Sequence, residues 1–324
     1  MATVTKCKGA RARSLSAKAA SFAGAIIAAC LASPASAEEG ALSPYLKGSA
    51  GFMSGYVPPQ SGLFVTDTYY YLHGSANAEV RNGNVELGID TTLNADLLSA
   101  TYVTDVEIMG GQYAVSGTLD WVWADLSATI DTPLGSIHAS PSNNGLGDSP
   151  VTPLILGWHD GDFHWSAAMS VYIPTGAYDT SSLSVGKNIW AVIPQFAITY
   201  FDPQSGWDVS GTFAYVTQSK NDATDYQSGD LLHVDWALGK KFGAGLAWEL
   251  GIAGNIMEQV GADRGTGAKL GPFKAQSVGL GPAIGYGAKF GNTPVNFSAK
   301  WEHDLDTHNT FRGDIVNVSA TVAF

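Results

Sequence analysis

Residues 316–324 read VNVSATVAF and end the chain with an apolar side chain at every second position. A period of two predicts a β-strand, because successive side chains of a strand point to opposite faces. A terminal strand that ends on an aromatic residue resembles the signal read by the bacterial outer-membrane barrel assembly machinery. That signal comprises Val318, Ala320, Val322 and Phe324. The stretch therefore favours an outer-membrane barrel over a soluble protein with a terminal strand.

The composition agrees with a surface that is largely hidden from water. Only 14% of the residues are charged, while 11% are aromatic and 38 are glycine. Soluble domains carry about 25% charged residues, so a chain this poor in charge is unusual among them. A lipid-facing surface would explain the difference.

Residues 1–37 have the organisation of a secretory signal peptide. A basic start is followed by the short apolar run Ala19–Ala32 and by the small-residue cleavage pattern Ala35–Ala37. Ile27–Cys30 also resembles a lipoprotein cleavage box, and a lipidated Cys30 is the alternative. Both cysteines, Cys7 and Cys30, lie in this leader. The exported protein is thus expected to fold without disulfides.

The charge balance and the motif content exclude several functions. The leader holds five of the 17 basic residues and none of the 29 acidic ones, so the remaining chain is strongly acidic. An acidic chain repels phosphate backbones, which makes nucleic acid an unfavourable partner. The sequence contains no HExxH, paired CxxC, GxSxG or Walker motif. We therefore predict no metal, no cofactor and no enzymatic activity.

Two regions follow the leader. Residues 38–62 contain Pro44, Pro58 and Pro59 without strand or helix periodicity, and we interpret them as a flexible periplasmic segment or a partial plug of a pore. Residues 63–324 are predicted to form one transmembrane barrel of about twelve antiparallel strands. The predicted strands are 63–72, 84–104, 107–130, 151–158, 162–173, 190–201, 206–218, 229–242, 245–258, 273–290, 294–304 and 311–324.

Alternation and connection length support the barrel. In the predicted strand 245–258, apolar residues such as Leu250 and Ile252 oppose small or polar ones such as Gly251 and Asn255. Connections alternate between long ones, such as 174–189, and short ones, such as 243–244. Long outer loops above short periplasmic turns are typical of outer-membrane barrels. The predicted environment is accordingly the outer membrane, with its lipid and lipopolysaccharide as partners.

Spaced motifs give a family resemblance over roughly residues 60–324. The chain resembles the outer-membrane transporters associated with meta-pathway phenol degradation, which are similar in fold to the pseudomonad amyloid-export barrel. The motifs are GLGD at 145–148, GWHDGDFH at 157–164, PTGAY at 174–178, SGW at 205–207, YQSG at 226–229, HVD at 233–235 and GLGP at 279–282. The resemblance implies a barrel of about twelve strands and a hydrophobic or aromatic cargo.

The expected function is a channel for uptake of small, largely neutral hydrophobic or aromatic solutes. A barrel of twelve strands is too narrow for a folded protein, and a lumen rich in carboxylates disfavours anions. A structural or adhesive surface barrel and an export channel are the alternatives. The predicted lumen residues are His164, Tyr172, Phe201, Asp208, His233, Asp235, Glu249, Lys300, Glu302 and Asp304.

The sequence contains two other candidate sites. His233 and Asp235 share a face, as in a hydrolase in which a carboxylate orients a histidine, but no serine is linked to them in sequence. Asp222, Asp225 and Asp263 lie in predicted outer loops. Those carboxylates are either solvated or positioned for a divalent cation or lipopolysaccharide.

Overall fold

The structure is a computed structural model that describes residues 43–80, 85–132, 135–268 and 274–324. The predicted signal peptide and the alternative lipidated Cys30 lie outside the described residues. Within the described part of the chain, no helix is long and apolar enough to cross a membrane.

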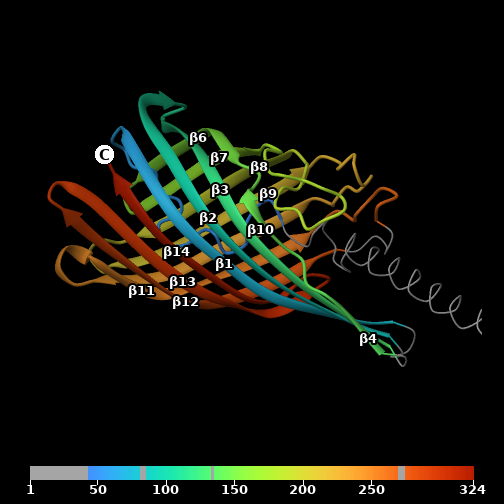
Figure 1. The fold of residues 1–324 in the computed structure, drawn as a ribbon. Coiled ribbons are helices and arrows are strands. Elements are labelled where there is room, and N and C mark those ends of the chain that lie inside the picture. Colours follow the sequence, from blue (N-terminus) through green and yellow to red (C-terminus); the bar gives the residue numbers. More distant parts are fainter. Residues whose placement is uncertain (1–42, 81–84, 133–134, 269–273) are drawn as a thin grey trace, which may run out of the picture.

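A closed ring of antiparallel strands forms the molecule (Figure 1). The described strands are β1 (Gly62–Val80), β2 (Val85–Ile108), β3 (Gly111–Thr132), β4 (Gly135–Ala139), β5 (Ser142–Leu146), β6 (Pro150–Asp160), β7 (Phe163–Tyr172), β8 (Ala191–Phe201), β9 (Trp207–Gln218), β10 (Leu231–Phe242), β11 (Trp248–Gln259), β12 (Gln276–Phe290), β13 (Thr293–His308) and β14 (Arg312–Ala323). A single 3₁₀ turn, η2 (Ala244–Leu246), is described between β10 and β11.

The wall has twelve positions, because β4, β5 and β6 pair with successive parts of β3 and together act as one interrupted strand. The ring closes where β1 pairs with β14, from Phe64 opposite Ala323 to Ser75 opposite Arg312. The prediction of an all-β, twelve-stranded antiparallel barrel of the outer-membrane type is confirmed.

The largest differences from the predicted boundaries lie at the start of the barrel. β1 continues to Val80, eight residues past its predicted end at Leu72. Together with β2, β3 and β4 it forms an extension that projects beyond the other strands (Figure 1). The pairing register of β2 with β3 shifts between Val103 and Glu107, as expected for strands of this length.

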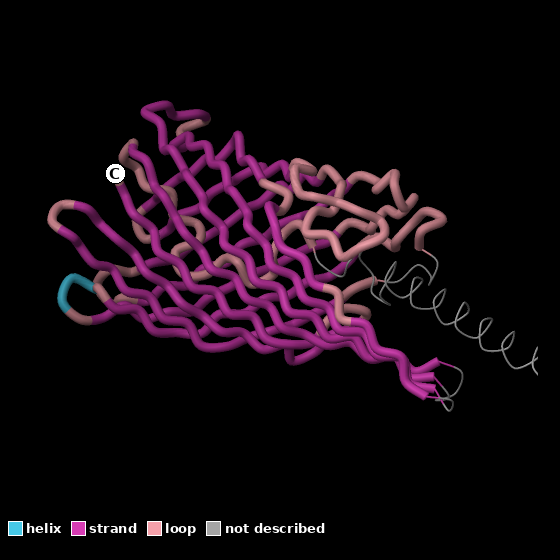
Figure 2. The backbone as a smooth tube through the Cα atoms, in the orientation of Figure 1, coloured by secondary structure: helices cyan, strands magenta, loops and turns pink. Residues whose placement is uncertain are grey.

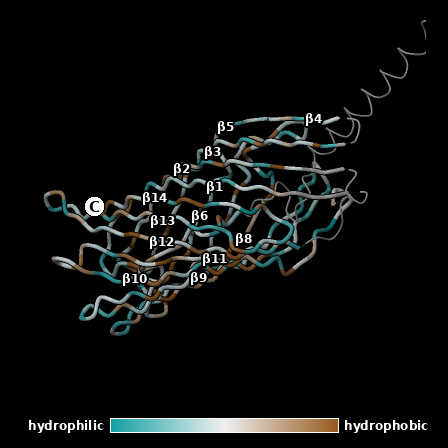
Figure 3. Tube along the Cα trace, turned by 90° about the horizontal axis from the view of Figure 1, so that it is seen from below, coloured by the Kyte–Doolittle hydropathy of each residue, from teal (hydrophilic) through white to brown (hydrophobic). Residues whose placement is uncertain are grey.

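The two faces of the wall follow the predicted alternation in the second half of the chain. In β10 the inward His233, Asp235 and Ala237 are buried, whereas the outward Leu232 and Leu238 are exposed. The same alternation holds in β11 and in β14, where Val318 faces outward and Asn317 inward. Hydrophobic residues lie mainly along the middle of the strands and hydrophilic ones towards the ends (Figure 3).

The connections also alternate as predicted. Short turns join β2 to β3, β6 to β7 and β12 to β13, whereas longer segments such as 173–190 and 219–230 join strands at the opposite end. Figure 2 shows these long connections gathered at the end of the barrel away from the C-terminus. Since outer-membrane barrels have short periplasmic turns, the gathered loops mark the outer end.

Candidate functional site

Residues 43–61, called the N-terminal segment below, lie inside the ring of strands. Their contacts with the wall are mainly backbone donors to inward side chains. Asp235 accepts hydrogen bonds from the amides of Gly48 (3.0 Å) and Ala50 (2.9 Å) and from the Tyr45 hydroxyl (2.9 Å). Nearer the short turns, the Met53 amide donates to Asp208 over 2.9 Å. The segment is thus fixed to predicted lumen residues.

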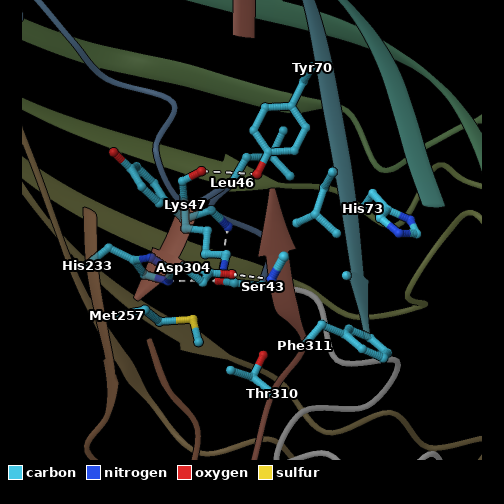
Figure 4. Close-up of a pocket in the computed structure, with 14 residues that line it drawn as sticks. Ser43, Leu46, Lys47, Tyr70, His73, His233, Met257, Asp304, Thr310 and Phe311 are labelled. Atoms are coloured by element: carbon cyan, nitrogen blue, oxygen red, sulfur yellow. Dashed lines mark hydrogen bonds and ion pairs between the residues drawn. The ribbon is translucent and has the colours of Figure 1, made fainter. Parts of the chain in front are cut away.

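An ion pair adds to these hydrogen bonds (Figure 4). The Lys47 Nζ atom lies 2.9 and 2.8 Å from the two carboxylate oxygens of Asp304 on β13. Both side chains are at most one-tenth exposed. The Tyr70 hydroxyl on β1 donates to the Lys47 carbonyl oxygen over 3.0 Å. Lys47 therefore joins the segment to two strands on either side of β14.

The other predicted charged residues form pairs near the same segment. Lys300 pairs with Glu302 at 3.0 Å and also donates to the Ala50 carbonyl oxygen. Glu249 pairs at 2.9 Å with Lys241, whose ammonium lies 5.5 Å from the Phe201 ring. The sequence prediction omitted Lys241, although it shares the inward row of His233 and Asp235. Nearly every buried lumen carboxylate thus has a cation or a donor beside it.

His164 and Tyr172 lie apart from this charged group. The His164 ring contacts Tyr56 edge to face at a centroid distance of 5.0 Å and lies 2.8 Å from the His159 Nδ1 atom. Tyr172 packs against the buried cluster of Tyr45 and Ile193. The predicted lumen residues are therefore spread along the barrel and do not form a single site.

The arrangement around His233 differs from that of a serine hydrolase. The His233 Nε2 atom lies 3.1 Å from the Ser43 hydroxyl, so a serine does reach it. Its Nδ1 atom is buried without a partner among the described residues. Asp235 receives donors from the N-terminal segment and does not orient the histidine. A catalytic triad requires that orienting hydrogen bond.

A cavity lies on the outer side of the N-terminal segment. We call it the chamber; it has a volume of about 560 Å³. Its floor includes Ser43, Pro44 and Leu46, and loop residues such as Leu183 and Val185 cover it. Its wall is apolar and comes from the inward rows of β2 and β3. These wall residues are Leu93, Ala95, Leu97, Val122, Ala124 and Leu126.

This apolar wall differs from the prediction of small and polar inward residues throughout the barrel. On β2 the pattern is reversed, with Leu93, Ala95 and Leu97 inward and the polar Asn94 and Asp96 outward. Alternation alone shows that two faces differ, but not which face meets lipid. Residues 89–98 mix polar and apolar side chains, and this mixture was the feature of the sequence that could have indicated the apolar inward wall.

The outer loops are held together over the chamber. Asp148 accepts hydrogen bonds from the amides of Gly176 (2.9 Å) and Lys187 (2.6 Å), which fixes both ends of loop 173–190. The side-chain amide of Asn221 donates a hydrogen bond to the Tyr178 hydroxyl over 2.8 Å and so connects loop 219–230 to loop 173–190. The chamber thus has an ordered outer cover.

The loop carboxylates have protein partners. Asp263 accepts from the Tyr226 hydroxyl (2.5 Å) and the Gly229 amide (3.0 Å), and burial raises the pKa of its carboxyl. Asp225 accepts from the Thr266 hydroxyl and amide and from Lys220, and these hydrogen bonds lower its pKa. Asp222 lies 3.3 Å from the same lysine. No described group of three or more acidic, histidine or cysteine residues could hold a metal ion.

Comparisons with known proteins agree with this architecture. Residues 74–320 match the family model described as "Putative MetA-pathway of phenol degradation". The COG4313 outer membrane channel from Pseudomonas putida F1 is similar in fold, with a TM-score of 0.59 and 16% identity over 83% of this chain and 97% of that one. A Pseudomonas aeruginosa FadL homologue is more distant, with a TM-score of 0.41 and 7% identity over 80% of this chain and 90% of that one. No curated protein matches.

Proposed function

Because the chain belongs to the MetA-pathway phenol degradation family, we propose that it is an outer-membrane channel for uptake of small, largely neutral aromatic or other hydrophobic compounds. The supporting observation is the chamber of about 560 Å³ with its apolar wall on β2 and β3. Burying apolar surface is favourable by about 25 cal/mol per Å², so such a wall retains hydrophobic solutes and not ions.

Apolar packing continues at the rim of the chamber. Ile89 on β2 is buried and packs with Phe311 and Leu126, and both of these residues line the chamber. We interpret this apolar rim as the outer end of the uptake path.

The N-terminal segment divides the path. It lies between the chamber and the periplasmic turns and is held by Asp235, Asp208 and Asp304. We propose that it is a partial plug, which must be displaced before a solute leaves the chamber. A purely structural surface barrel would not need an apolar chamber above such a segment. We propose no enzymatic role for His233, whose Nδ1 atom has no partner in the described structure.

Filling the chamber tests the uptake function. Ala95→Trp and Ala124→Trp place large side chains on the inward wall, and growth of a deletion strain on limiting aromatic substrate should then remain slow. The matched control is Ala320→Trp on the outward face of β14, which should restore growth like the wild-type gene. Barrel assembly is checked by heat-modifiable gel mobility. Normal growth with a correctly assembled, filled chamber would contradict the proposal.

A further inference from the structure

One acidic side chain stands in the apolar wall of the chamber. Asp120 on β3 lies in the same inward row as Val122, Ala124 and Leu126, directly opposite Leu97 in the pairing of β2 with β3. No described residue donates a hydrogen bond to its carboxyl group, and its Oδ1 atom is buried without a partner.

The other carboxylates that line the chamber are already satisfied. Asp148 accepts the amides of Gly176 and Lys187, and Asp179 accepts the amide and hydroxyl of Ser181. A buried acceptor without a donor costs about 1 to 3 kcal/mol. Asp120 bears this cost within a wall whose other side chains are mostly apolar, so a donor brought by a ligand would remove it.

We propose that Asp120 is the polar anchor of the chamber and selects hydrophobic ligands that carry one hydroxyl donor, such as phenols and aromatic alcohols. The ring of such a ligand lies against Leu93, Leu97 and Val122, and its hydroxyl donates to the Asp120 carboxyl. A carboxylate ligand is disfavoured, because it would bring a second negative group beside an acceptor. This inference rests on the proposed uptake function and names its ligand class.

The experiment uses the full protein in lipid nanodiscs and fluorine NMR with three probes, 4-fluorophenol, 4-fluorotoluene and 4-fluorobenzoate. Empty nanodiscs correct for partition into lipid. In Asp120→Leu, affinity for 4-fluorophenol should fall about ten- to hundredfold, within the range for a buried polar group left without its hydrogen-bond partner. Affinity for 4-fluorotoluene should stay within about threefold or improve, because an apolar side chain replaces the acid.

Two further variants make the result specific. Asp120→Asn keeps an acceptor, so it should retain more 4-fluorophenol affinity than Asp120→Leu and should bind 4-fluorobenzoate more tightly than the wild type does. Asp125→Leu changes an exposed acid on the outward face of the same strand and should leave all three affinities unchanged.

The outcomes separate the two proposals. Equal losses for 4-fluorophenol and 4-fluorotoluene, or unchanged 4-fluorophenol binding in Asp120→Leu, would overturn the anchor and leave the uptake function standing. Absence of binding of both neutral probes to the wild-type protein would overturn the uptake function and the anchor together.

Discussion

The ammonium of Lys47 lies within 2.9 Å of both carboxylate oxygens of Asp304, although 257 residues separate them in the chain. This pair connects the N-terminal segment to β13 in the barrel interior, where both side chains are largely buried. Replacing one partner of a buried ion pair destabilises a protein more than replacing both partners, since the remaining charge is buried without its counter-charge.

Release of the N-terminal segment should open the pore. Lys47→Met leaves the buried Asp304 carboxylate with the Gly313 amide but without its counter-charge and should weaken the seating of the segment by about 3 to 5 kcal/mol, so that conductance in planar bilayers rises. Deletion of residues 41–60 should raise it further. The double variant Lys47→Met with Asp304→Leu restores a neutral contact and should return conductance towards the wild-type level. Conductance that stays the same in the deletion variant would contradict the plug.

Arginine on the outward face should destabilise the barrel more than arginine on the inward face. Val318→Arg places a charge among lipid and should cost about 2 to 4 kcal/mol near the midplane. Leu250→Arg should cost less, because Leu250 is close to the short connection before β11. Ser319→Arg is the inward control. Equal unfolding free energies for Val318→Arg and Ser319→Arg would contradict the assignment of faces.

Gly251 faces inward in the alternation of β11, but arginine at Gly251 would be a misleading control for the inward face. A Cβ atom at this position would collide with the Leu238 carbonyl oxygen of the neighbouring strand. An arginine there would therefore destabilise the barrel through backbone displacement, whatever its charge.

The cover of the chamber should loosen when Asp148 is changed. Asp148→Ala removes the acceptor for the Gly176 and Lys187 amides and should cost about 1 to 3 kcal/mol of local stability. Hydrogen exchange of both amides should accelerate, while exchange in β10 stays slow. Asp148→Asn keeps one oxygen acceptor and should show an intermediate effect. Unchanged exchange in Asp148→Ala would show that other contacts hold the loop.

The contact between Asp225 and Thr266 should persist at moderately acidic pH. Hydrogen bonds from Thr266 and Lys220 lower the pKa of Asp225, so the folded loops favour the ionised carboxylate. Its contribution is complete above the ordinary aspartate pKa of about 4 and is lost as the pH falls through the lower folded value. Protection of the Thr266 amide, measured as its exchange rate relative to that of an unstructured amide at the same pH, should therefore fall only below about pH 4. A loss of protection near pH 6 would contradict this assignment.

The sequence was sufficient where alternation was regular. For strands such as β11 and β14, the inward and outward faces were predicted correctly. Their residues alternate with a period of two, and their apolar residues are the ones that face outward. The extension of β1 past Leu72 was missed, because residues 73–80 include Gly74 and Asn77, which have low strand propensity, and show no regular alternation of large apolar and polar residues. In the chamber, Leu93 and Leu97 were missed for another reason, because alternation does not show which face of a strand meets lipid.

The contacts of the N-terminal segment left little trace in sequence. Its donors to the wall include the backbone amides of Gly48, Ala50, Met53 and Gly55, and a backbone amide is present at almost any residue. Asp235 and Asp208, which accept three of these bonds, were predicted as lumen residues, but Thr199, which accepts the bond from Gly55, was not, and the donors could not be predicted. The contact of Ser43 with His233 could not be predicted from the sequence either, because 190 residues separate them.

The pairing of β1 with β14 also sets the order in which the molecule can assemble. Leu63 and Phe324 exchange backbone hydrogen bonds of 2.8 and 3.3 Å, so the seam joins the first barrel strand to the last residue of the chain. The seam cannot form until every other strand has been delivered, and until then β1 and β14 are open edges able to pair with other proteins. Since residues 43–61 directly precede β1, they must occupy the interior as the last seam closes or enter it afterwards from the periplasmic mouth.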